Sequence, residues 1–451
     1  MGAYFIRRLL LIPFTFIGIT LLVFTITRLA PGGPMDALKA ARQAGEMKKG
    51  AKEEKATTVS WQQALDDQER FDFHRSIPAA YLRWFGVLPR EVKVARAEIK
   101  PGAHAVMVAL SGSGREVEVK LDGTTITSAT VSNATTREPL GGEWKMRVES
   151  KEELQERWLS ANGLTGFPAW LKRIKGVPVA NRTPPADICP RVMVYQEFRS
   201  GLLQGDLRRS YRYNEPVWDM MAARFPISTF YGVLTLLAIY GICVPLGVLK
   251  AIRHRTFVDN ASSALIFMGY AIPGYALASV LLLVFGAQLA WFPMSGFTSD
   301  NFADLGTFGK IKDVFSHAVM PLMCYLVGGF AFTTMMVKNN LMDNLAADYV
   351  RTAVSKGVAF PRAVITHALR NSLIPLATTF GQHLGMFLLG SFIIEKIFDI
   401  DGFGLLGFNS ALERDYMVTM GILTVSSLLM LLGNVLSDFL VALTDPRVSY
   451  K

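Results

Sequence analysis

The sequence predicts an all-α membrane protein of six transmembrane helices, with a large α+β segment outside the membrane between the first two helices. Three observations favour this fold class: long uncharged apolar runs, one large polar block between them, and basic residues gathered in alternate loops. Of the 451 residues, 51% are hydrophobic and 19% are charged, whereas soluble proteins carry about 25% charged residues.

The apolar runs are long enough for six spans, since one span needs about 20 mostly apolar residues. The run 261–299 is too long for one helix, so we expect one span followed by an outer loop that starts near Trp291-Phe292-Pro293. The other spans are expected within residues 9–27, 225–249, 314–337, 371–394 and 416–437.

The first apolar run has the basic flank of a signal peptide, Arg7-Arg8. However, the run is long, and Arg28-Leu29-Ala30-Pro31 follows it in place of a small-residue cleavage site. We interpret it as a retained span, with cleavage left as an open alternative.

The loop charges predict that both termini are cytoplasmic. The two short outer loops hold only Lys310, Lys312, Lys396 and Arg414, and acidic residues accompany them. The net charge of +10 therefore reflects membrane topology, and a nucleic-acid partner is not needed to explain it. The basic residues expected on the cytoplasmic side are Arg7, Arg8, Lys250, Arg253, Arg255, Lys338, Arg351, Lys356, Arg362, Arg370, Arg447 and Lys451.

The polar block, residues 35–222, predicts a small α+β domain. Its first part, 37–55, is rich in Ala, Lys and Glu and is typical of a surface helix or a mobile segment. Asp122-Gly123 predicts a hairpin turn. Polar and apolar residues alternate, as in half-buried strands, over 91–99, 106–110, 117–121 and 143–148.

A helix is expected after these strands. Ser150 suits the N-cap, Glu153 stands at the capping-box position, and Leu154, Trp158 and Leu159 form an apolar face. The domain has no metal-spaced His/Cys cluster and no nucleophile elbow. We favour a scaffold or docking role, and a direct role in substrate binding stays open.

Several motifs resemble the inner-membrane permeases of binding-protein-dependent ABC importers, in the dipeptide, oligopeptide and nickel class. The N-terminal motifs are Arg7-Arg8-Leu9-Leu10 and Ala30-Pro31-Gly32-Gly33-Pro34, whose double glycine resembles the branch that imports oligopeptides and microcin-C-like peptide-nucleotide antibiotics. Further matches are Gly205-Asp206-Leu207, Arg224-Phe225-Pro226, Glu395, Arg414-Asp415-Tyr416 and Asp445-Pro446-Arg447.

The resemblance implies the type I permease fold and three regions. Residues 1–34 would hold the first transmembrane helix and its exit turn. Residues 35–222 would be periplasmic, with an extra α+β insertion at about 90–190 that the family pattern does not explain. Residues 223–451 would form a five-helix permease domain with a cytoplasmic coupling loop at 338–373.

The segment from Asp348 to Pro375 predicts two short helices with a fixed bend. Gly357 suits the left-handed cap that ends one helix, and Pro361 suits the first turn of the next. It resembles the family's coupling motif, which docks on the ATPase, with Thr352-Ala353 at the place of the small-residue pair. The coupling residues implied are Asp348, Tyr349, Arg351, Thr352, Ala353, Lys356, Gly357, Arg370, Asn371 and Pro375.

Catalytic chemistry is absent from the sequence pattern. There is no G-x-x-x-x-G-K-[ST], no H-E-x-x-H and no G-x-S-x-G, and the three cysteines form no C-x-x-C pair. We therefore expect no enzyme activity, no metal and no cofactor on this chain, with ATP and Mg bound by partner subunits. Gln382 and His383 within a span, and Glu395 near the outer interface, are candidates for the translocation path, with helix-to-helix hydrogen bonding as the alternative.

The resemblance implies a permease subunit in the bacterial inner membrane that forms half of a pathway for peptides or peptide-like compounds. Its expected partners are a second permease subunit, two ATP-binding subunits, a periplasmic substrate-binding protein and membrane lipid. A secondary, ion-coupled transporter is the alternative, although no convincing internal repeat supports it. An intramembrane enzyme would need paired catalytic residues at one depth, and none is evident.

Overall fold

The structure is a computed structural model. It describes residues 2–29, 74–110, 115–123, 125–132, 137–140, 143–161, 183–185, 188–388 and 390–444, together with positions 65, 69 and 72. The chain divides into two compact units, Met1–Val23 with Glu215–Lys451, and Phe24–Asn214. The motifs at 30–34 and 445–447 and the predicted surface segment at 37–55 lie outside the described residues.

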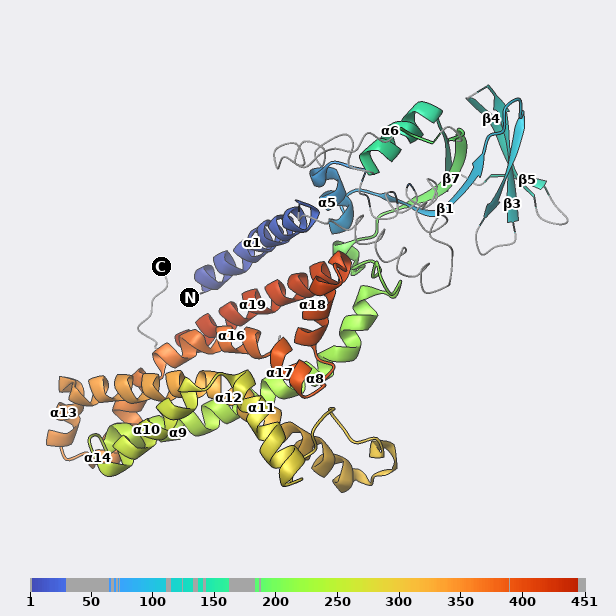
Figure 1. Cartoon of the computed structure of the whole chain (residues 1–451). Helices are drawn as coiled ribbons and strands as arrows, with labels where there is room; N and C mark the ends of the chain where they lie inside the picture. Colours follow the sequence, from blue (N-terminus) through green and yellow to red (C-terminus); the bar gives the residue numbers. More distant parts are fainter. Residues whose placement is uncertain are drawn as a thin grey trace. The chain divides into compact units, whose positions relative to one another are not determined.

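The first unit is helical (Figure 1). It holds most of α1 (Gly2–Leu29) and then α8 (Val217–Ala238), the π-helix η2 (Ile239–Cys243), α9 (Val244–Ile252), α10 (Phe257–Ala271), α11 (Gly274–Leu281), the π-helix η3 (Leu282–Gln288), the 3₁₀-helix η4 (Phe302–Asp304), α12 (Thr307–Ala346), α13 (Asp348–Ser355), α14 (Phe360–Ala363), the π-helix η5 (Val364–Leu369), α15 (Arg370–Ser372), α16 (Ile374–Leu388), α17 (Phe392–Ile397), α18 (Phe403–Leu412) and α19 (Tyr416–Thr444).

Within the described part of the chain, four continuous helical stretches are long and apolar enough to cross a membrane. They are Phe5–Leu29, Val217–Ile252, Thr307–Ala346 and Tyr416–Thr444, and each overlaps a predicted span. A fifth candidate, Phe257–Ala271 with Gly274–Gln288, is bent by 93°, so the run 261–299 starts as a broken span or a re-entrant loop.

The span predicted at 371–394 is shorter than expected. Its long helix, α16, has 15 residues, and a helix of that length spans about 22 Å of a hydrocarbon core that is about 30 Å thick. Gly390, with φ +70°, lies in the left-handed region beyond α16, and α17 follows as a separate helix. The six-span count therefore stays a prediction.

Glycine allows the closest helix contact in this unit. A Cβ atom at Gly381 of α16 would lie 1.8 Å from the carbonyl oxygen of Gly433 in α19. The backbone N–H of Gly381 also donates to Ser437 Oγ at 2.6 Å. Small residues that let backbones approach are typical of helix packing in membranes.

Among its described residues, the second unit contains two antiparallel sheets, with α5 before them in the chain and α6 between the strands β6 and β7. The first sheet has the order β1–β7–β6 and the second the order β2–β3–β4–β5. The elements are α5 (Ile77–Phe85), β1 (Arg90–Glu98), β2 (Ala105–Leu110), β3 (Arg115–Asp122), β4 (Thr125–Ser132), β5 (Arg137–Pro139), β6 (Trp144–Glu149), α6 (Lys151–Ala161), β7 (Arg191–Phe198) and the 3₁₀-helix η1 (Leu202–Gln204).

The predicted strands and helix of the polar block are confirmed. Inward-facing Val108, Val117 and Val119 are fully buried, which agrees with the alternating pattern. The Glu153 N–H donates to Ser150 Oγ at 3.2 Å, as expected for an N-cap.

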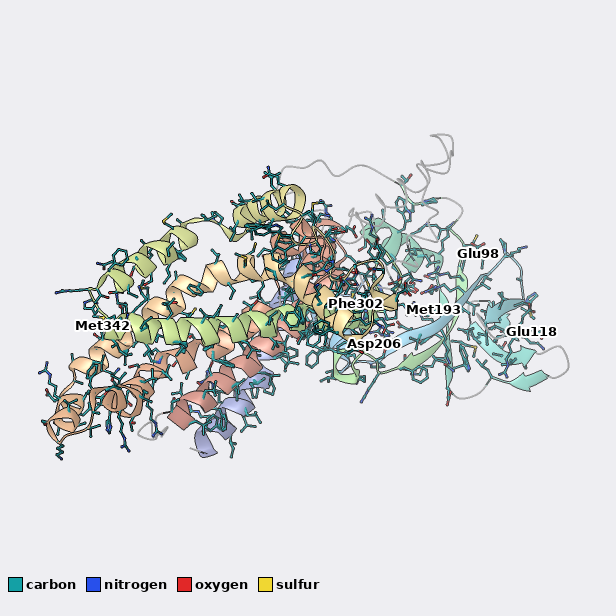
Figure 2. All side chains as sticks on the ribbon, turned by 90° about the horizontal axis from the view of Figure 1, so that it is seen from below. Glu98, Glu118, Met193, Asp206, Phe302 and Met342 are labelled. Carbon is teal, nitrogen blue, oxygen red and sulfur yellow. The ribbon has the colours of Figure 1, made fainter. Side chains whose placement is uncertain are left out.

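The sequence prediction missed β5 and β7. β7 is the central strand of its sheet and extends beyond the predicted end of the insertion near residue 190. Val192, Met193 and Val194 are successive buried residues, so this strand lacks the alternation that identified the others. Figure 2 labels Met193 on β7.

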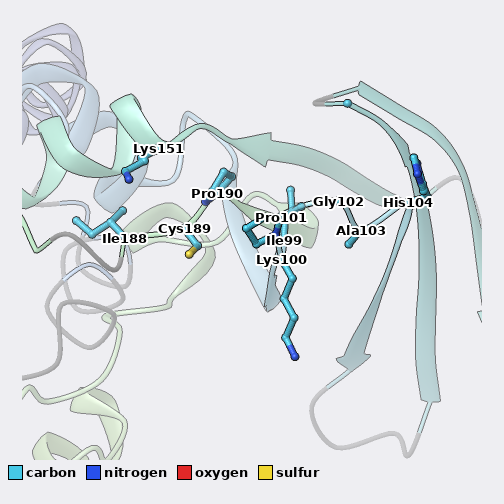
Figure 3. Close-up of a pocket in the computed structure, with 11 residues that line it drawn as sticks. Ile99, Lys100, Pro101, Gly102, Ala103, His104, Lys151, Ile188, Cys189 and Pro190 are labelled. Atoms are coloured by element: carbon cyan, nitrogen blue, oxygen red, sulfur yellow. The ribbon is translucent and has the colours of Figure 1, made fainter.

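An open pocket of about 400 Å³ lies beside the start of β7 (Figure 3). Lys100, His104, Lys151 and Cys189 are among the side chains that line it. Cys189 is a free, half-buried thiol, whereas Cys243 and Cys324 are free and buried.

Candidate functional site

The predicted bend at Gly357 is present. Gly357 has φ +89°, its N–H donates to the Val354 carbonyl at 2.9 Å, and the Val358 N–H donates to the Ala353 carbonyl at 3.2 Å. This pair of bonds is the Schellman motif, in which glycine satisfies the last carbonyls of a helix and turns the chain. α13 therefore ends where the sequence predicted.

The rest of the loop differs in detail from the prediction. Pro361 lies in the first turn of α14 as expected, but the second helix is divided into α14, the π-helix η5 and α15. The loop was predicted to start at Lys338, which lies inside α12. α12 continues to Ala346 because residues 338–346 contain no glycine or proline.

A small apolar core holds the loop against the ends of α9 and α12. Val350 of α13, with Ala363 and Val364, packs against Ala251 of α9 and Leu341 of α12. All five are buried, and Met342, labelled in Figure 2, packs against the same core. This core fixes the loop to two long helices.

Hydrogen bonds tie the two halves of the loop together. The Tyr349 hydroxyl donates to Asn344 Oδ1 at 2.6 Å and accepts from Asn371 Nδ2 at 3.1 Å. Arg370 Nε donates to the Thr444 carbonyl of α19 at 3.1 Å. Tyr349, Asn371 and Arg370 thus hold the loop in place. The sequence predicted these three as coupling residues.

Of the seven other predicted coupling residues, five are exposed on the loop and two are half-buried. Asp348, Arg351, Thr352, Lys356 and Gly357 are exposed, while Ala353 and Pro375 are half-buried. Apolar side chains share this surface, which we call the loop face. Besides Asp348, Arg351, Thr352, Lys356 and Gly357, the loop face contains Tyr349, Val354, Phe360 and Ile365.

The two candidate path residues in α16 have different surroundings. Gln382 is exposed. His383 is half-buried, its Nδ1 lies 3.2 Å from the Tyr240 hydroxyl of η2, and its ring packs edge-on to that tyrosine. A π-helix next to a polar contact inside a membrane protein is a frequent feature of functional sites.

Glu395 lies in a third environment, apart from this pair. It is 2% exposed, and its carboxylate accepts the Leu405 N–H at 2.6 Å. Its surroundings are those of a helix cap, and the structure does not bring it together with Gln382 or His383.

A cluster of three charged residues was not predicted from the sequence. Lys250 and Lys338 were counted as solvated loop charges, but both are buried and contact Asp259 of α10, at 3.0 Å and 2.7 Å. Asp259, a carboxylate just before the apolar run 261–299, could have indicated this cluster, since charges within the membrane are expensive and pair with one another.

The described residues contain no group of three or more His, Cys, Asp or Glu side chains that could hold a metal ion. The candidate site thus combines a rigid loop with polar contacts between membrane-spanning helices.

The comparisons identify the family. Residues 243–450 match the model of the binding-protein-dependent transport system inner membrane component. The peptidoglycan transport system permease protein YejB of Agrobacterium fabrum is 34% identical over 265 residues, which are 58% of this chain and 73% of that protein.

Two further relatives are similar. The inner membrane ABC transporter permease protein YejB of Escherichia coli O157:H7 is 36% identical over 238 residues, 52% of this chain and 65% of that protein. The oligopeptide transport system permease protein AppB of Bacillus subtilis is 33% identical over 262 residues, 58% of this chain and 81% of that protein.

These matches cover the helices that carry the loop, and they give no support to a secondary transporter. The chain belongs to the inner membrane components of binding-protein-dependent transport systems, the permease subunits of ABC importers.

Proposed function

We propose that this permease forms one half of the inner-membrane pathway of an importer for peptides or peptide-like compounds. The names of its relatives support this substrate class, since they refer to peptidoglycan, oligopeptide and dipeptide transport. A second permease subunit would supply the other half of the pathway, and a periplasmic binding protein would deliver the solute.

The segment from α13 to α15 is proposed as the coupling loop that docks on an ATP-binding subunit. One observation carries this proposal: the Schellman turn at Gly357 fixes two short helices into a rigid projection whose exposed face mixes apolar and basic side chains. Such a face, with aromatic anchors and arginine, has the composition of a protein interface. ATP and Mg would be bound by two partner subunits, and none by this chain.

The proposed orientation has six spans with both termini and the coupling loop in the cytoplasm. The basic residues of the loop support it through the positive-inside rule. Arg8, near the N-terminus, forms an ion pair with Asp438 near the end of α19, which is consistent with both ends lying on one side. The second unit, Phe24–Asn214, which we call the strand-rich unit, would then be periplasmic.

Gly357→Asp tests the coupling loop. A side chain at φ +89° is strained by roughly 1–2 kcal/mol for ordinary residues, and nothing in the described chain lies within 4 Å of the added Cβ. The variant should therefore insert normally and still bind the periplasmic receptor, but it should lose the ATP-binding subunit on co-purification and lose uptake.

Two matched variants separate the effect of the added charge from the effect of replacing glycine at the left-handed turn. Gly357→Asn has a side chain of the same size, which tolerates the left-handed region as aspartate does but carries no charge, so it should retain more ATPase than Gly357→Asp. Gly306→Asp adds the same charge at a glycine with φ −65° and an equally open surrounding, and it should leave ATPase association unchanged. Wild-type ATPase binding and uptake by Gly357→Asp would refute the coupling assignment.

A further inference from the structure

A buried ion cluster joins three helices of the permease. Asp259 in the first turn of α10 accepts two hydrogen bonds from Lys338 Nζ of α12, at 2.7 and 2.8 Å. Lys250 Nζ of α9 lies 3.0 Å from the same carboxylate. The side chain of Lys250 is 0% exposed and that of Asp259 is 3% exposed.

The polar groups of the cluster have close partners. Lys250 Nζ also donates to the Asp259 carbonyl at 2.8 Å, to Ser262 Oγ at 2.8 Å and to Ser263 Oγ at 2.7 Å. The Arg255 N–H donates to Asp259 Oδ2 at 3.1 Å. Removing the carboxylate would leave two ammonium groups without their buried counter-ion, which is strongly unfavourable.

The cluster lies one helical turn from the core that holds the proposed coupling loop. Lys250 is followed by Ala251, and Lys338 lies three residues before Leu341; Ala251 and Leu341 both belong to that core. α9 and α12 are also in close contact at Gly247, where a Cβ would lie 2.8 Å from Val337. α9, α12 and the loop therefore form one packed support.

α10 buries few apolar side chains of its own. Its buried residues are Asp259 and Ile266, whereas Leu265, Phe267 and Met268 are more than half exposed. α10 continues, through a 93° bend, into α11 and η3. Among the described residues, the ion cluster is thus a polar connection between α10 and the helices that hold the loop, while α11 packs on α12 through Ala278 and Leu281.

We propose that Asp259 is a positioning residue that makes α10 move together with α12 and the coupling loop when the ATP-binding subunits change conformation. The proposal rests on the proposed function of the loop. It assigns to the cluster the transfer of motion from the ATPase side to the bent helix pair, a role distinct from docking.

The most direct test is the double variant Asp259→Asn/Lys338→Gln. It removes one negative and one positive charge, and Lys250 keeps the carbonyl of residue 259, Ser262 and Ser263 as acceptors. The variant should insert and co-purify with the ATP-binding subunits. In proteoliposomes with the binding protein, uptake of a radiolabelled tetra-alanine peptide per ATP hydrolysed should fall by about tenfold, a typical size of coupling between sites.

A distance measurement separates coupling from simple stability. Spin labels at Met268 on α10 and Asp343 on α12 should keep one distance in wild type, with and without ATP and vanadate, because the helices move as one body. In the double variant, trapping with vanadate should change that distance. A role in stability alone would lower the amount of inserted protein without this change.

Single variants complete the design. Asp259→Asn alone should reduce the amount of inserted protein, because both lysines remain buried, whereas Asp259→Glu should recover part of the uptake. Asp343→Asn, which changes an exposed carboxylate on α12, is the control and should behave as wild type. Wild-type uptake per ATP and an unchanged label distance in the double variant would overturn the proposal, while the Gly357 variants test the coupling loop separately.

Discussion

The carboxylate of Glu395 caps the helix α18 through Leu405, whose backbone N–H donates to it at 2.6 Å. The neighbouring Phe403 N–H donates to Ser228 Oγ of α8 at 2.7 Å. Gly402 leaves the space for the carboxylate, since a Cβ there would lie 2.6 Å from Glu395 Cδ. Two side chains from separate helices thus satisfy the first amide groups of α18, as capping residues do.

Glu395→Ala should lower the stability of the permease by about 2 kcal/mol, because it leaves a buried amide without an acceptor and creates a cavity. Glu395→Gln keeps an acceptor oxygen and should cost less, and Ser228→Ala should also cost less. The thermal midpoint of the purified protein in detergent checks this order. Asp304→Ala removes an exposed carboxylate and should not shift the midpoint; an unshifted midpoint for Glu395→Ala would contradict the capping role.

The strand-rich unit should lose stability in acid through Glu149. This carboxylate accepts from Arg191 Nε at 2.5 Å and Arg157 Nη1 at 2.9 Å. Burial raises the pKa of Glu149, but Arg191 and Arg157 outweigh burial and lower the pKa to about 2. Because the pKa is lowered on folding, the stabilisation is complete above the unfolded value of about 4.5 and is lost as the pH falls toward 2.

The free energy of unfolding should fall by on the order of 3 kcal/mol as the pH falls from about 4.5 to about 2. Hydrogen exchange of the β6 and β7 amides in the full-length protein, measured at steps between pH 5 and pH 2.5, would follow it. Glu149→Gln should already be destabilised at pH 7 and should show a flatter dependence in the same window. An equal slope in both proteins would assign the acid sensitivity to other groups.

The strand-rich insertion should be removable if the cut respects β7. Arg90 and Phe198 are paired at the ends of β1 and β7, and a Cβ at Gly201 would lie 2.6 Å from the backbone nitrogen of Gly86. The two ends of the excised segment are therefore adjacent. Replacing residues 90–198 with a short Gly-Ser linker should leave the membrane helices inserted and the ATPase bound.

The control for this excision removes only residues 90–181 and so keeps β7. It leaves β7 with both edges unpaired and with Val192, Met193 and Val194 uncovered. Such an edge promotes aggregation, so this variant should yield less inserted protein than the longer deletion. Equal yields would show that β7 does not depend on its sheet.

The proposed periplasmic location of the same unit can be tested by thiol labelling. In a Cys189→Ser background, a cysteine at Asp122 should react with a membrane-impermeant reagent added from outside intact cells, because Asp122 is exposed. A cysteine at Lys356 should react only after the membrane is opened. The reverse pattern would invert the topology and remove the coupling assignment with it.

Local signals explain what the sequence predicted well. The left-handed turn at Gly357, the cap at Ser150 and the alternating strands each depend on a few neighbouring residues, and the structure has all of them. The π-helices η2, η3 and η5 were not predicted, because no local pattern of residues in the sequence indicates them.

Contacts distant in sequence explain what was missed. Lys338 and Asp259 are 79 positions apart, so a count of loop charges could not show that they neutralise each other in a buried cluster. Glu395 was predicted as a candidate for the translocation path, and its contact with Leu405 depends on the turn that brings α18 back to it. β7 was missed because Arg191, Val192, Met193 and Val194 are buried in succession, so the strand lacks the alternation that identified the others.

The crossing of α16 and α19 offers a comparison within one helix. A Cβ at Gly381 would lie 1.8 Å from the Gly433 carbonyl oxygen, and the contact is with backbone, so the helices would have to separate. A Cβ at Gly385, one turn along, would lie 3.6 Å from Met430, which is ordinary packing distance. Gly381→Ala should therefore be strongly destabilising, while Gly385→Ala should be tolerated.

Thermal unfolding in detergent and peptide uptake in membranes would measure both variants. Forced separation costs about 1–3 kcal/mol or more in a close-packed interface, and it would also lengthen the 2.6 Å bond from the Gly381 N–H to Ser437 Oγ. Ser437→Ala, which removes only that bond, should cost less than Gly381→Ala. If Gly381→Ala and Gly385→Ala have the same midpoint, the two helices do not cross at Gly381 and Gly433, and the arrangement of α16 against α19 is wrong.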